Sequence, residues 1–251
     1  AGMSSYGFIP FITSFTPFAS RRICDQIAIS IAYAKQNVKI IGSDPGISAE
    51  FNGGTHMSME DIGVLRSIPE LVIYEPVDVA QFKQALPQIV AYEGPVYIRM
   101  FRKTIDDVFT DANYKFDLFG ADCIQEGTAV TIFCSGIMVQ ETMKANEILK
   151  QEGIDAEIIN IHTIKPIDRD AVVASAKKTG AVVVAENHNV IGGLTSAVCE
   201  VLMEEYPVPL RAVGVKDRFG QVGKMPFLKE EYHMTAKDIV SAVKEVIRLN
   251  K

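Results

Sequence analysis

The stretch Thr-Ala-Val-Thr-Ile-Phe-Cys, residues 128–134, decides the fold of the second half of the chain. It is apolar and rich in β-branched residues, and it ends at Ser135-Gly136. A short apolar run bounded by turn residues is typical of a buried strand. Residues 139–151 follow with the apolar spacing of a helix, which Gly153 ends. The pattern therefore predicts a strand followed by a helix that packs on a sheet.

The same alternation continues to the end of the chain. Further strands are predicted at residues 156–161, 182–185 and 210–215, and further helices at residues 168–179, 194–205 and 236–249. Continuous apolar strands separated by amphipathic helices indicate a parallel sheet covered on both faces. We therefore predict a three-layer α/β domain over residues 121–251.

The first part of the chain also has an α/β pattern. Strands are predicted at residues 38–42, 71–75 and 96–101, and helices at residues 22–36 and 78–92. Pro87 should kink or break the second of these helices. Residues 1–102 are predicted to form another three-layer α/β domain. Residues 103–120 contain several aspartates and few aliphatic side chains, so they are predicted to link the two domains.

Composition narrows the class of protein. The 251 residues carry a net charge of −6 and the pI is about 5.3, which disfavours binding to nucleic acid or to an acidic membrane surface. No apolar run approaches the roughly 18 residues that a membrane span needs. The four cysteines form no Cys-x-x-Cys pair, which argues against a disulfide framework and a zinc site and fits a reducing cytoplasm.

Two motifs in the first part of the chain suggest a ligand site. Gly53-Gly54-Thr55-His56 lies in a glycine-rich loop after a predicted strand, where ligands usually meet an open α/β sheet. His56 is suited to proton transfer near neutral pH, or it is an ordinary surface residue of a tight turn. Phe15 and Phe18 either stack on a flat heteroaromatic ring or belong to the core.

Charged side chains at strand ends admit similar alternatives. Arg99 and Arg102 flank the end of a predicted strand, where an arginine binds a phosphate or is simply solvated. The segment from Glu186 to Leu194 reads as a strand, a turn and the start of a helix, a junction able to hold an anion. His162 and His233 have no partner pattern and are predicted to be structural.

Taken together, these segments resemble the transketolase family over essentially the whole chain. Residues 1 to about 102 resemble most of the pyrimidine-binding domain, and residues 121–251 resemble the carboxy-terminal transketolase domain. The matching stretches are Thr13-Ser14-Phe15 with Phe18, Val38 to Gly42, Thr55-His56 with Met59-Glu60-Asp61, Gly94 to Arg99 with Arg102, Ile164 to Asp168, Glu186-Asn187-His188 with Gly192-Gly193-Leu194, and Asp217 to Gly220.

The resemblance implies a reaction and roles for single residues. Transketolases use thiamine diphosphate to transfer a two-carbon ketol unit from a ketose to an aldose, as in the pentose phosphate pathway. Phe15 and Phe18 match the aromatics that pack the cofactor's aminopyrimidine ring. His56 matches the histidine at the substrate hydroxyls and would assist proton transfer. Arg102 matches the arginine that holds the substrate phosphate.

Two substrate positions depart from the family pattern. Asn52 stands where many members have an acidic residue beside the active-site histidine. Asp44 stands where many have a histidine that contacts phosphate, and a carboxylate there would repel a phosphate. The sequence therefore predicts an atypical substrate, such as a non-phosphorylated or modified sugar.

Other family features are missing from the printed sequence. The glutamate that activates the aminopyrimidine lies upstream of the aromatic motif in the family, so we expect the start of the pyrimidine-binding domain to be missing. Gly-Asp-Gly followed by asparagine does not occur, and no residue is assigned as a metal ligand. We therefore expect a partner chain or domain to bind most of the diphosphate and its Mg²⁺ or other divalent cation, as in split transketolases. A homodimer or heterotetramer and an inactive isolated chain are expected.

The sequence also allows other enzymes with the same fold and a non-enzymatic role. The chain could belong to a deoxyxylulose-phosphate synthase or to the β subunit of a 2-oxo acid dehydrogenase. It could also be a non-catalytic dimerisation module. A nicotinamide-binding domain is disfavoured because the glycines lack the spacing of the dinucleotide fingerprint.

Overall fold

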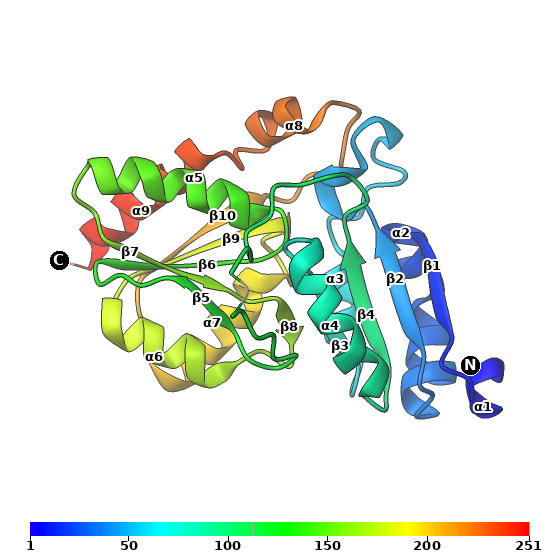
Figure 1. Cartoon of the computed structure of the whole chain (residues 1–251). Helices are drawn as coiled ribbons and strands as arrows, with labels where there is room; N and C mark the ends of the chain where they lie inside the picture. Colours follow the sequence, from blue (N-terminus) through cyan, green and yellow to red (C-terminus); the bar gives the residue numbers. More distant parts are fainter. Residues whose placement is uncertain (112, 251) are drawn as a thin grey trace.

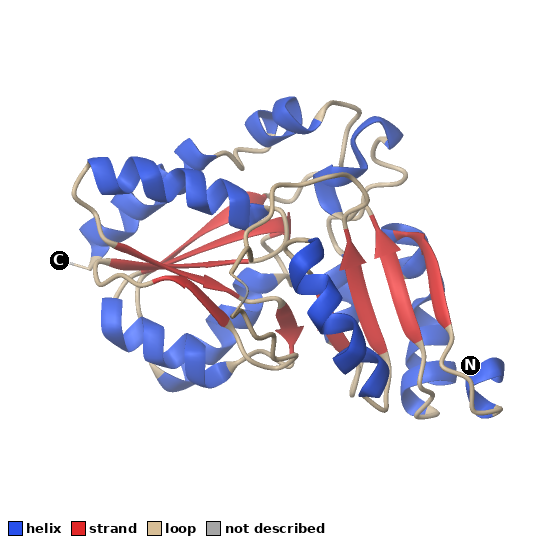
Figure 2. Ribbon diagram, viewed as in Figure 1, coloured by secondary structure: helices blue, strands red, loops and turns tan. Residues whose placement is uncertain are grey.

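The computed structural model of the chain describes residues 1–111 and 113–250. It contains two five-stranded sheets that lie side by side, with the amino terminus beside one and the carboxyl terminus beside the other (Figure 1). Helices cover both faces of each sheet (Figure 2). The predicted α/β architecture of two three-layer units is confirmed.

The first sheet has the strand order β1-β2-β4-β3-β8. Its strands are β1 (Phe11–Phe15), β2 (Lys39–Ser43), β3 (Val72–Tyr74), β4 (Val96–Met100) and β8 (Thr163–Lys165). The helical segments of this part are α1 (Gly2–Ser5), α2 (Thr16–Ala19), the 3₁₀ helix η1 (Arg21–Ile23), the π-helix η2 (Gln26–Tyr33), the 3₁₀ helix η3 (Gly46–Asn52), α3 (Asp61–Arg66) and α4 (Val79–Ala91). Because side chains alternate along a strand, η2 and α3 bury one face of this sheet and α4 buries the other.

The second sheet has the strand order β10-β9-β6-β7-β5. Its strands are β5 (Asp122–Gln125), β6 (Val130–Cys134), β7 (Ala156–Asn160), β9 (Val182–Asn189) and β10 (Leu210–Val215), and its helices are α5 (Met138–Gln151), α6 (Arg169–Thr179), α7 (Leu194–Glu205), α8 (Met225–Glu231) and α9 (Ala236–Leu249). Val130, Ile132 and Cys134 of β6 face the core under α5 and α9, whereas Phe133 faces α6 and α7. The apolar strand β6 is thus buried on both faces, as its sequence predicts.

The sheet predicted to be parallel over residues 121–251 has one antiparallel edge strand, and the first sheet also ends in an antiparallel strand that was not predicted. β5 runs antiparallel to β7, and β8 runs antiparallel to β3 of the first sheet. Residues 122–125 are of mixed polarity and β8 has three residues, so neither segment has the apolar run that marks a buried strand. β1, which pairs in parallel with β2 along residues 11–15, was not predicted either.

Pro87 does not break α4, which rules out one of the two outcomes expected from the sequence. The helix runs from Val79 to Ala91 with the proline inside it. Pro87 and Lys83, whose carbonyl would have accepted the missing N–H, both lie on the exposed face of the helix. Water can hydrate that carbonyl, so the lost hydrogen bond carries no burial penalty.

The helix predicted at residues 22–36 consists of two pieces, η1 and the π-helix η2. Ile27 and Ala32 of η2 are buried and lie five residues apart, which matches the hydrogen-bond spacing of a π-helix. Within residues 1–111 and 113–250, we find no helix with the length and apolar character to cross a membrane.

One buried hydrophobic cluster includes residues of both sheets. Ile40 and Ile62 of the first unit belong to the same buried cluster as Phe133 and Leu194 of the second. Across this junction, the backbone N–H of Glu75 donates to the carbonyl of His162 at 2.8 Å. The junction therefore places the ends of β3 and β4 against residues that follow β6 and β7.

Candidate functional site

An aromatic cluster forms at the carboxyl ends of β1 and β2. Phe15 ends β1, Phe18 lies in α2, and His56 lies in the loop after η3. The Phe15 and Phe18 rings meet edge to face, with centroids 6.2 Å apart. The imidazole of His56 lies 5.0 Å from Phe15 and 5.1 Å from Phe18. All three side chains are half-buried, so the structure brings these predicted residues together at the surface.

Arg102 and Asp44 extend this cluster. The Arg102 guanidinium lies over the Phe15 ring, 4.8 Å from its centroid, and its Nε donates to Asp44. The Asp44 side chain is 3% exposed and that of Arg102 is 55% exposed. The carboxylate expected to repel a substrate anion is thus paired with the arginine expected to bind one. The outer part of that guanidinium remains open to solvent.

The glycine-rich loop before His56 is shaped by close backbone approach. A Cβ on Gly54 would lie 2.4 Å from the carbonyl oxygen of Gly220, and Gly53 has a φ of +69°. Both conditions favour glycine, as the sequence suggested. The hydroxyl of Thr55 lies 2.9 Å from Nδ1 of His56 and fixes the orientation of its ring.

Asn52 is in the same loop but makes a different contact. Its side-chain amide donates to the backbone oxygen of Ala49 at 2.8 Å, so its polar group is held on its own helix η3. The structure therefore does not join Asn52 to the cluster of Phe15, Phe18 and His56 by a described contact.

Arg99 is neither a phosphate ligand nor a solvated strand end. It is 1% exposed, and its Nε donates to Asp61 at 2.7 Å while Nη1 donates to Glu75. Ser135, which follows β6 of the second sheet, donates to Glu75 at 2.7 Å. Burial alone would lower the pKa of Arg99, but the Asp61 and Glu75 carboxylates raise it above its ordinary value. Arg99 thus anchors a buried ionic network between the two sheets.

The junction from Glu186 to Leu194 holds an acidic side chain of the chain itself. The Glu186 carboxyl accepts hydrogen bonds from the backbone N–H groups of Leu194 at 2.7 Å and Thr195 at 3.0 Å, at the start of α7. This end of the helix is therefore occupied rather than open to an external anion, which corrects the sequence expectation. Burial raises the pKa of Glu186 to about 7 and lowers that of the neighbouring His188 to about 4.

The two remaining histidines differ in their environment. His162 is fully buried, 4.6 Å from the Phe116 ring and 5.7 Å from the Tyr74 ring between centroids. Burial lowers its pKa to about 4. The side chain of His233 is 78% exposed and lies 3.7 Å from Asp238.

Family comparisons cover both units. The family model described as "Transketolase, pyrimidine binding domain" matches residues 1–106, and the model described as "Transketolase, C-terminal domain" matches residues 120–239. The chain belongs to the transketolase family. That family generally uses thiamine diphosphate.

Three members of the transketolase family show how far the likeness extends. The 6-deoxy-6-sulfo-D-fructose transketolase subunit SqwH of Clostridium sp. (strain MSTE9) is 56% identical over 98% of this chain and 76% of its own length. An apulose-4-phosphate transketolase subunit of Phocaeicola vulgatus is 32% identical over 99% of this chain and 79% of its own length. A solved split gene transketolase, described as an inactive β4 tetramer, has a TM-score of 0.92 and 41% identity, covering 100% of this chain and 80% of that one.

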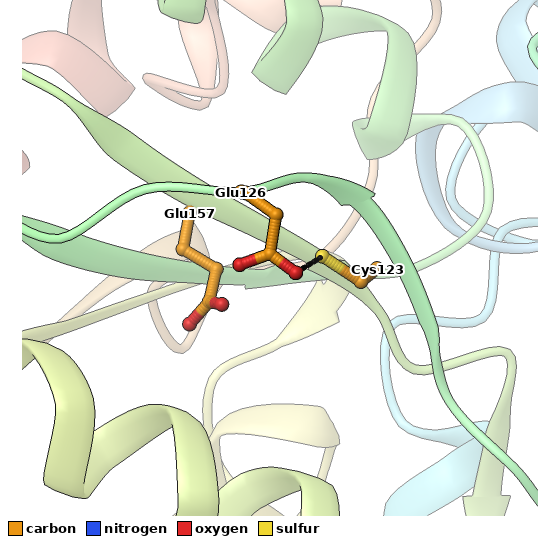
Figure 3. Close-up of side chains that lie close together, drawn as sticks. All are labelled: Cys123, Glu126 and Glu157. Atoms are coloured by element: carbon orange, nitrogen blue, oxygen red, sulfur yellow. Dashed lines mark hydrogen bonds between the residues drawn. The ribbon is translucent and has the colours of Figure 1, made fainter.

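A group of metal-type ligands lies elsewhere in this transketolase chain, at the β5–β7 edge. It comprises Cys123, Glu126 and Glu157, whose side chains gather at one place, and the Cys123 thiol lies 3.5 Å from Glu126 (Figure 3). The Lys178 ammonium pairs with both glutamates. This ammonium already occupies the space between the two carboxylates and offsets part of their charge, so the group does not support a bound cation.

Sequence reasoning missed two contributors to the site. The Arg22 guanidinium lies over the Phe18 ring at 3.9 Å from its centroid, but Phe18 precedes the helix predicted at residues 22–36, so helical spacing gave no signal for this contact. Asn187 contacts the turn after Asp44, although it is 140 residues away from Ile47 in the chain. No sequence signal links these two positions.

Proposed function

We propose that this chain is the carboxy-terminal subunit of a thiamine-diphosphate-dependent transketolase, which transfers a two-carbon ketol unit from a ketose to an aldose. The single observation that carries the proposal is the cluster of Phe15, Phe18, His56 and Arg102 at one edge of the sheet, within a family that generally uses this cofactor. The family relation supports this reaction class, and the cluster supplies side chains with suitable chemistry.

The aromatic corner fits the pyrimidine half of the cofactor. Phe15 and Phe18 are half-buried and their ring planes are 80° apart, so together they form two apolar walls against which a flat heteroaromatic ring can pack. Arg22 and Arg102 lie over these rings and bound the corner. When bound, thiamine diphosphate supplies the carbanion and the electron sink for carbon–carbon cleavage.

A partner subunit completes the site in this proposal. The printed sequence has no Gly-Asp-Gly followed by asparagine, so we assign the diphosphate and its divalent cation mainly to the partner. Two relatives are named as transketolase subunits, and the solved relative is described as an inactive β4 tetramer. These descriptions support an oligomer that needs a partner subunit for activity, and we propose a homodimer or heterotetramer with an amino-terminal subunit.

His56 is proposed to exchange a proton with a substrate hydroxyl. The Thr55 hydroxyl occupies Nδ1 of the imidazole, which leaves Nε2 for the substrate. The edge-to-face contacts with Phe15 and Phe18 hold the ring beside the place assigned to the pyrimidine. Proton transfer and cofactor packing thus share one corner.

The pair of Arg102 and Asp44 points to a ketose with a terminal sulfonate. A sulfonate carries a single negative charge, whereas a phosphate monoester carries about −1.5 to −2 at neutral pH. Asp44 offsets the charge of Arg102, so the pair attracts a dianion less than an unpaired arginine would. The relative that is 56% identical is named for a sulfonated sugar, 6-deoxy-6-sulfo-D-fructose, which supports this substrate class.

Reconstitution with a diphosphate-binding partner tests the reaction. The complex should transfer a ketol unit in the presence of thiamine diphosphate and Mg²⁺, and His56→Ala should lower kcat by about 10²–10⁴-fold. His233→Ala is the matched control because this histidine is exposed and distant from the aromatic corner in sequence. Full activity of the His56→Ala complex would favour a non-catalytic module. Use of pyruvate as donor, with release of CO₂, would favour the synthase or dehydrogenase alternative.

The ratio of kcat/KM for sulfonated and phosphorylated ketoses tests the substrate class. Asp44→Asn removes the carboxylate and keeps a side chain that tolerates the positive φ of +53°. It should shift the ratio toward phosphate by about tenfold, because one opposing charge next to Arg102 is lost. Equal use of both substrates by the wild type, unchanged in Asp44→Asn, would refute the sulfonate assignment.

A further inference from the structure

The side chain of Asn187, in the second sheet, forms hydrogen bonds with the turn that follows Asp44 in the first unit. This side chain near the end of β9 is fully buried. Its Oδ1 accepts from the backbone N–H of Ile47 at 3.0 Å, and its Nδ2 donates to the backbone oxygen of Pro45 at 2.8 Å. Both polar groups of the amide are thus used by a single turn of the other unit.

The turn is built to fit this amide closely. Gly46 lies between Pro45 and Ile47. It has a φ of +56°, and a Cβ there would lie 2.2 Å from Oδ1 of Asn187. Glycine is therefore required on both counts. The backbone oxygen of Asn187 accepts from Arg99 at 3.0 Å, so the end of β9 is itself held in place.

The turn bound by Asn187 is adjacent in sequence to Asp44, which forms an ion pair with Arg102. Pro45 follows Asp44, whose backbone N–H donates to the oxygen of Met100 at 2.9 Å. The Asp44 carboxylate pairs with Arg102, and the Arg102 guanidinium lies over Phe15. The Asp44 side chain thus lies between the turn and Arg102, whose backbone N–H also donates to the carboxylate at 3.4 Å.

We propose that Asn187 is a positioning residue that sets the preference for the terminal anion of the substrate. By fixing residues 45–47 it fixes Asp44, and through Asp44 it aims the Arg102 guanidinium. This inference rests on the proposed function. It gives the second sheet a part in substrate selection at a site that the first sheet carries.

The test compares Asn187→Ala with Asn160→Ala in the reconstituted complex. Asn160 is a matched control, because it is equally buried in the second sheet and donates to Asp122 at 3.1 Å, away from the turn. We expect Asn187→Ala to lower kcat/KM for a sulfonated ketose about tenfold relative to the same ketose with a terminal hydroxyl. The loss should lie in KM, and Asn160→Ala should leave the ratio unchanged.

An Arg102→Gln background separates positioning from general damage. In that background Asn187→Ala should cause no further change in the ratio, because the two residues act in series. Asn187→Asp keeps the size of the side chain and the Oδ1 acceptor but loses the Nδ2 donor to Pro45, and it should reproduce the loss if Asn187→Ala folds poorly. An unchanged ratio in both Asn187→Ala and Asn187→Asp, or an equal loss without Arg102, would overturn the positioning role.

The NMR resonance of the Arg102 Nε–H group gives a readout that needs no turnover. It should shift in Asn187→Ala and remain in place in Asn160→Ala, because only the first change frees Asp44. An unshifted resonance counts against the inference by itself. Absence of ketol transfer by the wild-type complex would instead overturn the proposed function, while the resonance still decides whether Asn187 positions Arg102.

Discussion

Replacing Arg99 with methionine tests whether the buried ionic network holds the two sheets together. Arg99 donates to Asp61 through Nε at 2.7 Å and Nη2 at 3.2 Å, and to Glu75 through Nη1. The Asp61 and Glu75 side chains are at most 3% exposed. Methionine fills much of the same space but offers no charge and no donor. Both carboxyl groups therefore lose their cationic partner inside the protein.

The expected loss is about 3–5 kcal/mol of the free energy of unfolding, the usual cost of removing one partner of a buried ion pair. Asp61 keeps the hydroxyl of Tyr97 at 2.9 Å and Glu75 keeps that of Ser135 at 2.7 Å. These two hydrogen bonds lessen the penalty without replacing the charge. Glu75→Gln in the same background should recover part of the loss, because it removes one uncompensated carboxylate.

Urea unfolding followed by circular dichroism, at a fixed chain concentration, measures this loss. Arg211→Met is the matched control, because Arg211 pairs with Glu245 at the surface with side chains 37% and 58% exposed. That pair should contribute less than about 1 kcal/mol. A loss in Arg99→Met no larger than the control, or further loss on adding Glu75→Gln, would refute the reasoning.

Two further variants probe a buried histidine and a helix cap. Burial lowers the pKa of His162 from 6.5 to about 4, so its contribution to stability is complete above pH 6.5 and is lost as pH falls toward 4. When the pH falls from about 7 to about 5, the unfolding free energy should drop by about 2 kcal/mol less in His162→Asn than in the wild type, as measured by urea titration. The same drop in both proteins would contradict this assignment. Asp168 caps α6 by accepting from the N–H of Ala171 at 3.0 Å. Asp168→Ala should cost about 1–2 kcal/mol in the same assay, whereas a similar cost for Asp170→Ala would exclude capping as the cause.

Periodic segments could be predicted from sequence, because their burial pattern is local. The bounds of α7, β10 and α9 agree with prediction, since each element has a continuous apolar run or face. β5 and β8 could not be found in this way, because their pairing depends on partners distant in the chain. Short strands of mixed polarity leave no comparable signal.

Residue types indicated part of the candidate site, but not how its members contact one another. Phe15, Phe18, His56 and Arg102 were singled out by family resemblance, and the parallel ends of β1 and β2 bring them together. The fate of Arg99 could not be foreseen, because its partners come from separate elements with no shared pattern. Buried polar networks are decided by tertiary geometry rather than by local sequence.

The position of β8 in the first sheet affects both limited proteolysis and thermal unfolding of the chain. β8 belongs to the second half of the sequence, yet it extends the sheet of the first half, and the side chain of Lys165, its last residue, donates to the backbone oxygen of Arg66 at 2.8 Å. After a protease cut within residues 103–111, β8 of the carboxy-terminal fragment would still pair with β3 of the amino-terminal fragment, so the two fragments should stay associated. The two halves are therefore expected to melt in one cooperative transition, as one folding unit rather than two detachable modules.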